Sequence, residues 1–404
     1  MINRNDNGLP MGGRGETTRL LLLESLLRRP NQSRAQLGET LGVARATITS
    51  LLGELERAGM VEQRVVDLTD PGRRTIGRPP QQVTLRPGAA YAVGLDFGHR
   101  HIRAALCDLG GNVVADRWSE AAVDTDPQGS LDLAQVLTRA VLTESGVARG
   151  HVIGLGAGLA APVNLVGGSI ELNGMLPAWN GLNLAEELEH RLGLPTRVDN
   201  DANVGAMGEH LFGVGRGVAD MVYLRLSAGV GLGLVLNGQI YRGAIGVAGE
   251  IGHIAVHGGD LICRCGNRGC LETVASPVAV ADLLARSRGE AVSVTQLMTL
   301  VRANDRGACR AVADAGEAVG AAIASTVNLL NPDLVVIGGE LAAAGELLVA
   351  PIRRAIGMGA VAPAANHVRV AVSSMADRAE VLGAAGIQLA RAPQALARRL
   401  AAAA

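Results

Sequence analysis

Apolar residues recur at helical spacing near the start of the chain. Within residues 16–28, leucines return every three or four positions, which predicts a helix that Pro30 ends. Ser33 can cap a second helix, which we expect to run to about Leu41, where Gly42 supplies a turn. The pattern therefore predicts two short helices separated by only a few residues.

A third helix is predicted from about residue 44 to Gly59. Helix, short glycine-containing turn and helix is the arrangement of a helix-turn-helix. The apolar side of the third helix should pack inward through Ile48, Leu51 and Leu52. Its polar side offers candidate readers of DNA bases and phosphates near the helix N-terminus, which are Arg45, Thr47, Thr49 and Ser50.

The segment after this helix is predicted to form a β-hairpin wing. Residues 60–66 and 82–85 have the pattern of strands, and residues 70–80 between them are rich in turn-forming and basic side chains. Three arginines among Gly and Pro suit an extended arm that enters a narrow minor groove; they are Arg73, Arg74 and Arg78. Three short helices also occur in dimerisation or docking domains, but the basic wing and the terminal position favour DNA binding.

Two later segments share one pattern, a strand, a Gly-rich turn, a second strand and a hairpin turn. They are residues 92–112 and 222–239. The repetition predicts two lobes of similar fold that face each other across a cleft, where each Gly turn offers backbone N–H groups to an anion. Taken singly, either turn would be an ordinary β-turn.

Composition is that of a globular protein with two or three domains. The chain has 404 residues, 48% of them hydrophobic, and the sequence shows no run of eighteen apolar residues and no signal-peptide pattern. We therefore expect a cytoplasmic protein without a membrane partner. Residues 1–86 hold thirteen Arg against nine Asp and Glu, a net charge of +4, which points to this segment as the part that would meet a polyanion. An ordinary solvated surface has a similar charge, so the motifs carry the prediction of DNA binding.

Three of the five cysteines gather in one short loop with two glycines. Cys263, Cys265 and Cys270, with His253 ten positions upstream, form a Cys3His set that is typical of a closed structural zinc site. A redox site and chance packing of thiols are the alternatives, and the compact loop with an available histidine favours the metal. If one nitrogen of His253 binds zinc, the other can donate to a ligand hydroxyl, so the metal would shape a pocket without doing chemistry.

Acidic residues flank the cysteine loop on both sides. Folding of the loop around a metal would bring Glu250, His253 and Glu272 to one place. Carboxylates and an imidazole form good hydrogen bonds with sugar hydroxyls. Each residue alone would be an ordinary surface group, whereas their joint occurrence indicates a carbohydrate pocket.

Five motifs connect the chain to a known family. They are Gly-Leu-Asp-Phe-Gly at 94–98, Val-Asp-Asn-Asp-Ala-Asn at 198–203, Ala-Gly-Glu-Ile-Gly-His at 248–253, the cysteine loop at 263–272 and Val-Ile-Gly-Gly at 336–339. With these motifs, from about Thr17 to about Leu389, the chain resembles the ROK family (repressor, open reading frame, kinase). Its members are bacterial sugar kinases and, where an N-terminal winged helix-turn-helix is present, sugar-responsive regulators.

The resemblance implies an α/β protein whose two-lobed body has the actin-like fold of sugar kinases and the heat-shock-protein-70 ATPase. The expected domains are a winged helix-turn-helix over 1–86, a first lobe over 87–200, a second lobe with the zinc loop over 201–376, and a C-terminal helix that returns to the first lobe over 377–404.

The same resemblance implies a sugar site and its ligands. It maps hexose contacts onto Asn200, Asp201, Glu250, His253 and Glu272, and further hydroxyl contacts are expected around Asn173 and Gly174. It also implies the same four zinc ligands. In the kinases, the aspartate that matches Asp201 is the general base that deprotonates the attacking sugar hydroxyl.

The nucleotide-binding turns depart from the family pattern. After the first Gly turn the kinases continue Gly-Thr-Lys, whereas this chain has His99, Arg100 and His101. In the second turn, the hydroxyl expected at Ala228 is missing. Because the β- and γ-phosphates need close approach to the backbone, we expect poor ATP binding or none and treat Asp201 as a vestigial base, with residual kinase activity left open.

Together these features predict a sugar-responsive transcription regulator that represses genes of sugar uptake or catabolism. A sugar in the cleft would change the relative placement of the lobes and hence the affinity for operator DNA. We expect a homodimer or tetramer that reads a palindromic operator. Two alternatives stay open, an ATP-dependent sugar kinase with a DNA-binding appendage and a constitutive DNA-binding protein whose body only oligomerises.

Overall fold

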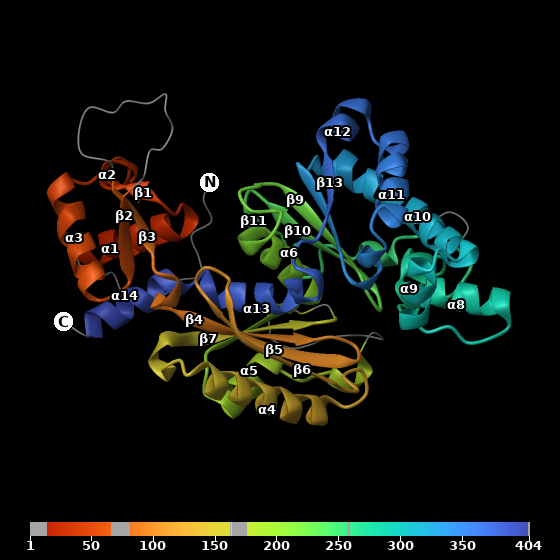
Figure 1. Ribbon diagram of the computed structural model, residues 1–404, viewed down its shortest axis with the longest axis horizontal. Helices are drawn as coiled ribbons and strands as arrows, with labels where there is room; N and C mark the ends of the chain where they lie inside the picture. Colours follow the sequence, from red (N-terminus) through yellow and green to blue (C-terminus); the bar gives the residue numbers. More distant parts are fainter. Residues whose placement is uncertain (1–13, 66–80, 162, 164–175, 257–258, 403–404) are drawn as a thin grey trace.

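The first domain is the predicted winged helix-turn-helix, in a computed structural model that describes residues 14–65, 81–161, 163, 176–256 and 259–402 (Figure 1). Three helices, α1 (Arg14–Arg28), α2 (Arg34–Leu41) and α3 (Arg45–Arg57), precede an antiparallel hairpin of β2 (Val61–Val65) and β3 (Gln81–Leu85), and the short β1 (Gln32–Ser33) pairs with β3. Ser33 caps α2 in a capping box, and Gly42 ends it with φ of 64°, a left-handed value that suits glycine. The predicted helices and hairpin are confirmed.

The first lobe of the body is built on a five-stranded mixed sheet in the order β6-β5-β4-β7-β8. The strands are β4 (Tyr91–Phe97), β5 (His101–Asp108), β6 (Val113–Glu120), β7 (Val152–Leu159) and β8 (Thr196–Asn200). β4 and β5 form the predicted hairpin, while β7 lies parallel to β4 and β8 parallel to β7. Two helices, α4 (Pro127–Ser145) and α5 (Leu184–Leu192), cover one face of the sheet, and their leucines complete its core (Figure 1).

The second lobe repeats this plan with the order β11-β10-β9-β12-β13. Its strands are β9 (Met221–Leu226), β10 (Val230–Leu236), β11 (Gln239–Ile240), β12 (Leu334–Gly338) and β13 (Arg369–Val372). Its helices are α7 (Glu272–Ala275), α8 (Pro277–Arg288), α9 (Val294–Arg302), α10 (Arg306–Leu330), α11 (Glu346–Gly359) and α12 (Ala362–His367). In both lobes an antiparallel hairpin is extended by parallel strands, which confirms the predicted pair of similar lobes.

Two helices, α6 (Asp201–Phe212) and α13 (Ala379–Leu389), lie against each other at the junction of the lobes. Gly383 allows their close approach, because a Cβ at this position would overlap the carbonyl of Val204. After α13 the chain forms a further helix, α14 (Ala392–Ala402), which packs against α1. Ala392 and Leu396 are buried in the core of the winged-helix domain, a placement that the sequence did not indicate.

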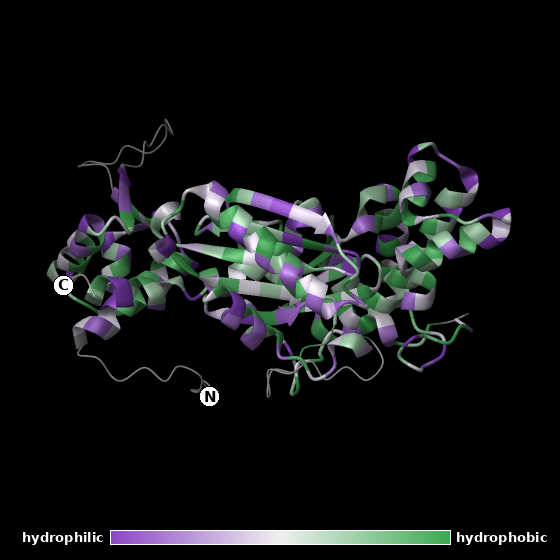
Figure 2. Ribbon diagram, turned by 90° about the horizontal axis from the view of Figure 1, so that it is seen from below, coloured by the Kyte–Doolittle hydropathy of each residue, from purple (hydrophilic) through white to green (hydrophobic). Residues whose placement is uncertain are grey.

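The distribution of hydrophobic residues agrees with strands inside the body and helices outside it. The strands inside the body are mostly hydrophobic, whereas the outer helices carry both hydrophobic and hydrophilic positions (Figure 2). None of the helices within the described ranges is long and apolar enough to cross a membrane.

Candidate functional site

The polar face of α3 is open to solvent. All four of the predicted DNA-reading residues on it are exposed, namely Arg45, Thr47, Thr49 and Ser50, while Ile48 on the opposite face is buried. The hydroxyl of Thr49 donates to the carbonyl of Arg45 at 2.9 Å, which orients it along the helix. The wing residues Arg73, Arg74 and Arg78 lie outside the described residues.

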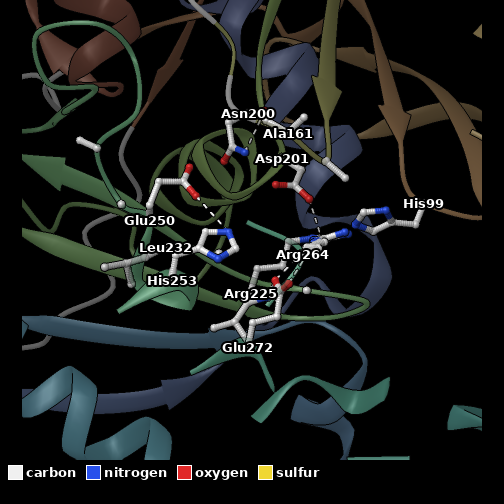
Figure 3. Close-up of a pocket in the computed structure, with 16 residues that line it drawn as sticks. His99, Ala161, Asn200, Asp201, Arg225, Leu232, Glu250, His253, Arg264 and Glu272 are labelled. Atoms are coloured by element: carbon white, nitrogen blue, oxygen red, sulfur yellow. Dashed lines mark hydrogen bonds and ion pairs between the residues drawn. The ribbon is translucent and has the colours of Figure 1, made fainter. Parts of the chain in front are cut away.

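A pocket between the lobes brings together five of the predicted sugar-site residues (Figure 3). They are Asn200, Asp201, Glu250, His253 and Glu272. The predicted Asn173 and Gly174 lie outside the described residues. In this conformation the pocket encloses about 40 Å³, whereas ligand sites usually have about 300–1,000 Å³. The side chains of Arg225 and Arg264 both line it (Figure 3).

Asn200 and Asp201 are placed by the start of α6. Asn200 caps the helix, because its side-chain oxygen accepts from the backbone N–H of Ala202 at 2.9 Å and its amide donates to the carbonyl of Ala161 at 3.1 Å. Asp201 is only 7% exposed. Its Oδ1 accepts from Ala202 N–H at 2.7 Å, and its Oδ2 pairs with Arg225 Nη1 at 2.8 Å. Both oxygens of the predicted base therefore already hold a donor.

Glu250 has the fewest partners among the carboxylates of the pocket. Its Oε2 lies 3.7 Å from Nε2 of His253, at the edge of ion-pair distance. Burial, followed by repulsion from Asp201 and Glu272, raises the pKa of Glu250 to about 7. Near neutral pH this carboxyl group can therefore be either a hydrogen-bond donor or an acceptor, which suits a hydroxyl ligand.

Glu272, at the start of α7, is held by two donors. Its Oε2 accepts from the backbone N–H of Val230 at 3.1 Å, so it ties the cysteine loop to the second Gly-rich turn. Its Oε1 pairs at 3.0 Å with Nε of Arg264, which lies between two of the cysteines in sequence. Arg264 thus crosses the pocket from the cysteine loop (Figure 3).

The four predicted metal ligands lie next to this pocket. One ligand atom from each of His253, Cys263, Cys265 and Cys270 lies within 4.8 Å of the others. A tetrahedral ion with metal–sulfur bonds of about 2.3 Å places its sulfurs about 3.8 Å apart. The sulfurs of Cys265 and Cys270 are 3.7 Å apart, so the cluster fits such an ion.

The two nitrogens of His253 face different groups. Nδ1 lies 3.6 Å from the sulfur of Cys263, and Nε2 faces Glu250 in the pocket. Burial, with the neighbouring thiols, raises the pKa of Cys270 to about 12, so three thiolates this close together require a cation. The side chain of His253 therefore lies between the Cys3His cluster and the pocket.

Three lining residues with titratable side chains were not among the predicted sugar contacts: His99, which was predicted only as part of the first Gly-rich turn, Arg225 and Arg264. Arg225 is the single charged residue of β9, whose residues are all buried. A cation in such a strand requires carboxylate partners, and this signal could have identified it. His99 is held by Asp124, at 2.8 Å from its Nδ1.

A second cleft of about 1260 Å³ also borders Arg225. Its lining includes the first Gly-rich turn, where Nε2 of His101 lies 3.0 Å from Oδ2 of Asp96. The His101 ring lies so close to Gly98 that a Cβ on this glycine would overlap it. The hydrogen bond to Asp96 raises the pKa of His101. An imidazole–carboxylate pair therefore fills this turn.

Comparisons with known proteins agree with both parts of the chain. The ROK family pattern matches residues 92–391, and the winged helix-turn-helix DNA-binding pattern matches residues 16–62. The chain is 27% identical over 372 residues to a xylose repressor of Bacillus subtilis (strain 168), covering 91% of this chain and 93% of that protein.

Two solved structures share the fold. A ROK family transcriptional regulator, a homolog of the E. coli MLC protein, has a TM-score of 0.77 and 26% identity, covering 96% of this chain and 98% of that chain. A ROK family glucokinase from Streptomyces griseus, in complex with glucose and AMPPNP, has a TM-score of 0.64 and 27% identity. The match covers 74% of this chain and 99% of the glucokinase chain.

These matches confirm the actin-like body, the winged helix-turn-helix and the predicted class of sugar-responsive DNA-binding repressor. The regulator matches nearly the whole chain, whereas the glucokinase leaves about a quarter of it unmatched. The chain belongs to the ROK family, within the group whose members carry an N-terminal winged helix-turn-helix.

Proposed function

We propose that this DNA-binding repressor changes its affinity for operator DNA when an aldose enters the pocket between the lobes. The observation that carries the proposal is the pocket itself, where Glu250, His253 and Glu272 face the start of α6. One relative is named a xylose repressor, and one structural neighbour holds glucose. Pentoses and hexoses are therefore the effector classes that we propose.

Hydroxyl recognition is assigned to the pocket carboxylates. A sugar hydroxyl both donates and accepts, and Glu250 can match it in either role because its pKa is about 7. Asn200 and Asp201 would receive further hydroxyls at the start of α6. Since the pocket now encloses only about 40 Å³, an aldose must displace Arg264 and part the lobes, and this movement is the proposed signal.

The metal cluster is proposed to hold zinc through His253, Cys263, Cys265 and Cys270. Zinc with four protein ligands has no open position and supplies a structural cross-link, without taking part in chemistry. With Nδ1 of His253 on the metal, Nε2 is left to face a sugar hydroxyl. The zinc site would therefore hold one wall of the pocket in shape.

DNA contacts are assigned to the exposed face of α3 and to the wing. The base and phosphate readers would be Arg45, Thr47, Thr49, Ser50, Arg73, Arg74 and Arg78. A homodimer or tetramer would pair two such domains on a palindromic operator in the cytoplasm. The exposure of the four α3 residues supports this assignment.

The proposal is tested by measuring operator affinity with and without sugar. The operator duplex is first selected from random DNA by the full-length protein, and its binding is followed by fluorescence anisotropy. D-xylose, D-glucose and other aldoses are then titrated in. We expect at least one to change the operator Kd by about 5- to 150-fold. Sugars that bind by calorimetry but leave the operator Kd unchanged contradict the proposal.

An ATP-dependent sugar kinase is the second candidate. Asp201 lines the sugar pocket, and the cleft of about 1260 Å³ lies beside it across Arg225. However, Arg225 holds one oxygen of Asp201 and His101 fills the first turn. A coupled kinase assay with Mg-ATP and aldoses distinguishes the two candidates. Sugar phosphorylation by the wild type that is abolished in Asp201→Asn would favour the kinase.

A further inference from the structure

Arg225 stands between the two cavities and binds a carboxylate on each side. It lines both the sugar pocket and the larger cleft, and it is 7% exposed. Its Nη1 pairs with Oδ2 of Asp201 at 2.8 Å, and its Nε pairs with Oε1 of Glu380 at 3.0 Å. Loss of either carboxylate would leave a poorly compensated buried charge, which is strongly unfavourable. The two ion pairs therefore depend on each other.

Glu380 fixes the start of α13. It is the second residue of that helix and is 5% exposed. The same oxygen that binds Arg225 also accepts from the hydroxyl of Tyr223 at 2.9 Å, so β9 holds the helix through two side chains. The position of α13 is therefore set by a hydrogen-bonded network whose other end is the pocket carboxylate Asp201.

α13 is packed too closely to yield locally. Gly94 of β4 lies against the carbonyl of Val381, and Gly383 lies against the carbonyl of Val204 in α6; a Cβ at either glycine would overlap that carbonyl. Backbones in direct contact leave no side chains that could absorb a shift. A displacement at the start of α13 is therefore passed along the helix.

α14 carries such a displacement into the DNA-binding domain. Only residues 390–391 separate α13 from α14, and the two helices follow each other from the lobe junction to the winged helix (Figure 1). Leu396 is buried in the core that contains the α1 leucines. Arg399 donates to the carbonyl of Ala89 at 2.7 Å, and Gln394 donates to Glu24 of α1 at 3.3 Å.

We propose that Arg225 is a positioning residue that carries sugar binding from Asp201 through Glu380 to α13, α14 and the winged helix. A sugar hydroxyl that donates to Asp201 competes with Arg225 for the same oxygen. Arg225 then shifts toward Glu380, and the start of α13 moves with it. This inference rests on the proposed function, since it names the connection between its two sites.

Two variants of the full-length protein test the connection. Glu380→Gln keeps the size and the hydrogen-bond acceptor but removes the charge, and Arg225→Lys keeps the charge but cannot bridge two carboxylates. Glu209→Gln is the control, because Glu209 is also buried and accepts from the hydroxyl of Ser373, without an ion pair to Arg225 or a hydrogen bond to Tyr223. Sugar Kd is measured by calorimetry with D-xylose and D-glucose, and operator Kd by anisotropy with and without the sugar.

We expect Glu380→Gln to bind sugar within about threefold of wild type, while its sugar-dependent change in operator Kd falls to about a tenth of the wild-type value or less. Because Arg225 lines the pocket, Arg225→Lys is compared only at saturating sugar, where its sugar-dependent change in operator Kd should fall in the same way. Glu209→Gln should retain the full change. A wild-type response that both variants keep overturns this inference alone. A wild-type protein that binds sugar without any operator response overturns the proposed function together with it.

Hydrogen exchange in the wild-type protein gives a test that does not depend on the folding of any variant. Saturating sugar should alter amide exchange in α13, in α14 and in the packed part of α1. Altered exchange confined to the pocket, with no change in α14, would contradict the inference.

Discussion

The two cavities that share Arg225 differ in how their charged groups are used. In the larger cleft, two buried carboxylates each have a cation within ion-pair distance, Asp96 through one oxygen with His101 and Glu380 with Arg225. In the smaller pocket, Glu250 has only a distant contact with His253, and its pKa of about 7 keeps it able to donate or accept. Groups that satisfy each other hold a fold in place, whereas an under-satisfied carboxyl group beside the Cys3His cluster is available to a ligand.

Substitution of a predicted metal ligand is expected to have the largest effect on the smaller pocket, measured as its affinity for sugar. Cys263→Ser should remove the bound zinc and weaken D-xylose or D-glucose binding on the order of 100-fold, because the wall that carries Glu250 and Glu272 loses its cross-link. Metal content is measured by plasma mass spectrometry and sugar Kd by calorimetry. Cys309→Ser, outside the cluster, should change neither. Zinc-free protein that binds sugar with full affinity would refute the role of the metal.

Removal of the Glu250 carboxylate should have the second-largest effect on the sugar Kd. Glu250→Ala should raise the sugar Kd about 10- to 100-fold, the usual cost of leaving a buried hydroxyl without its hydrogen-bond partner. The counterpart in the larger cleft, His101→Gln, should leave the sugar Kd unchanged. Equal losses in the two variants would remove the distinction between the cavities.

The pair in the larger cleft should show a small pH-dependent effect on stability. Because the hydrogen bond to Asp96 raises the pKa of His101, the folded state holds the proton more tightly than the unfolded state. Its contribution is complete below about pH 6.5 and is lost as the pH rises through the raised pKa. His101→Gln should therefore cost roughly 0.5 kcal/mol at about pH 6 and less at about pH 9, since the side chain is 37% exposed.

Urea unfolding of wild type and His101→Gln at both pH values measures this difference. In an Asp96→Asn background the pH dependence should disappear. A penalty that grows with pH would contradict the assignment of the pair.

The smallest expected effect is that of nucleotide. Mg-ATP should shift the melting temperature by less than about 1 °C, because the phosphate position of the first turn is filled, whereas a binding aldose should raise it. Differential scanning fluorimetry compares the two ligands on the same preparation. A clear, saturable stabilisation by Mg-ATP would reopen the kinase alternative.

Local sequence patterns predicted the helix ends, the turns and the cysteine loop, because each of these depends on residues that are close together in the chain. Ser33 and Gly42 have the cap and turn roles expected of them, because capping depends on residues three or four positions away. The cysteine loop was equally readable, since three of its four ligands lie within eight residues. The repeated strand and turn pattern predicted the two lobes, and the family motifs added Asn200 and Asp201 to the pocket residues.

Contacts between distant segments were not readable in the same way. Arg225 in a buried strand signals that a carboxylate must face it, but nothing in the pattern selects Glu380, which lies 155 residues away. The helical pattern after residue 377 likewise indicates an apolar face without naming the surface that covers it, so the place of α14 was missed. Such pairings depend on the final topology, which periodicity alone does not encode.

The packing of α14 into the winged-helix core has a consequence for how the molecule is made. The operator-reading module draws its interior from both ends of the described chain, because Ala392 and Leu396 complete the layer that the α1 leucines begin. During synthesis, residues 14–85 leave the ribosome hundreds of residues before α14, which completes this core, has been made. The core of the winged-helix domain can therefore be completed only after both lobes of the body have been translated. A winged-helix domain with a complete core is thus always attached to the lobes that bind the effector.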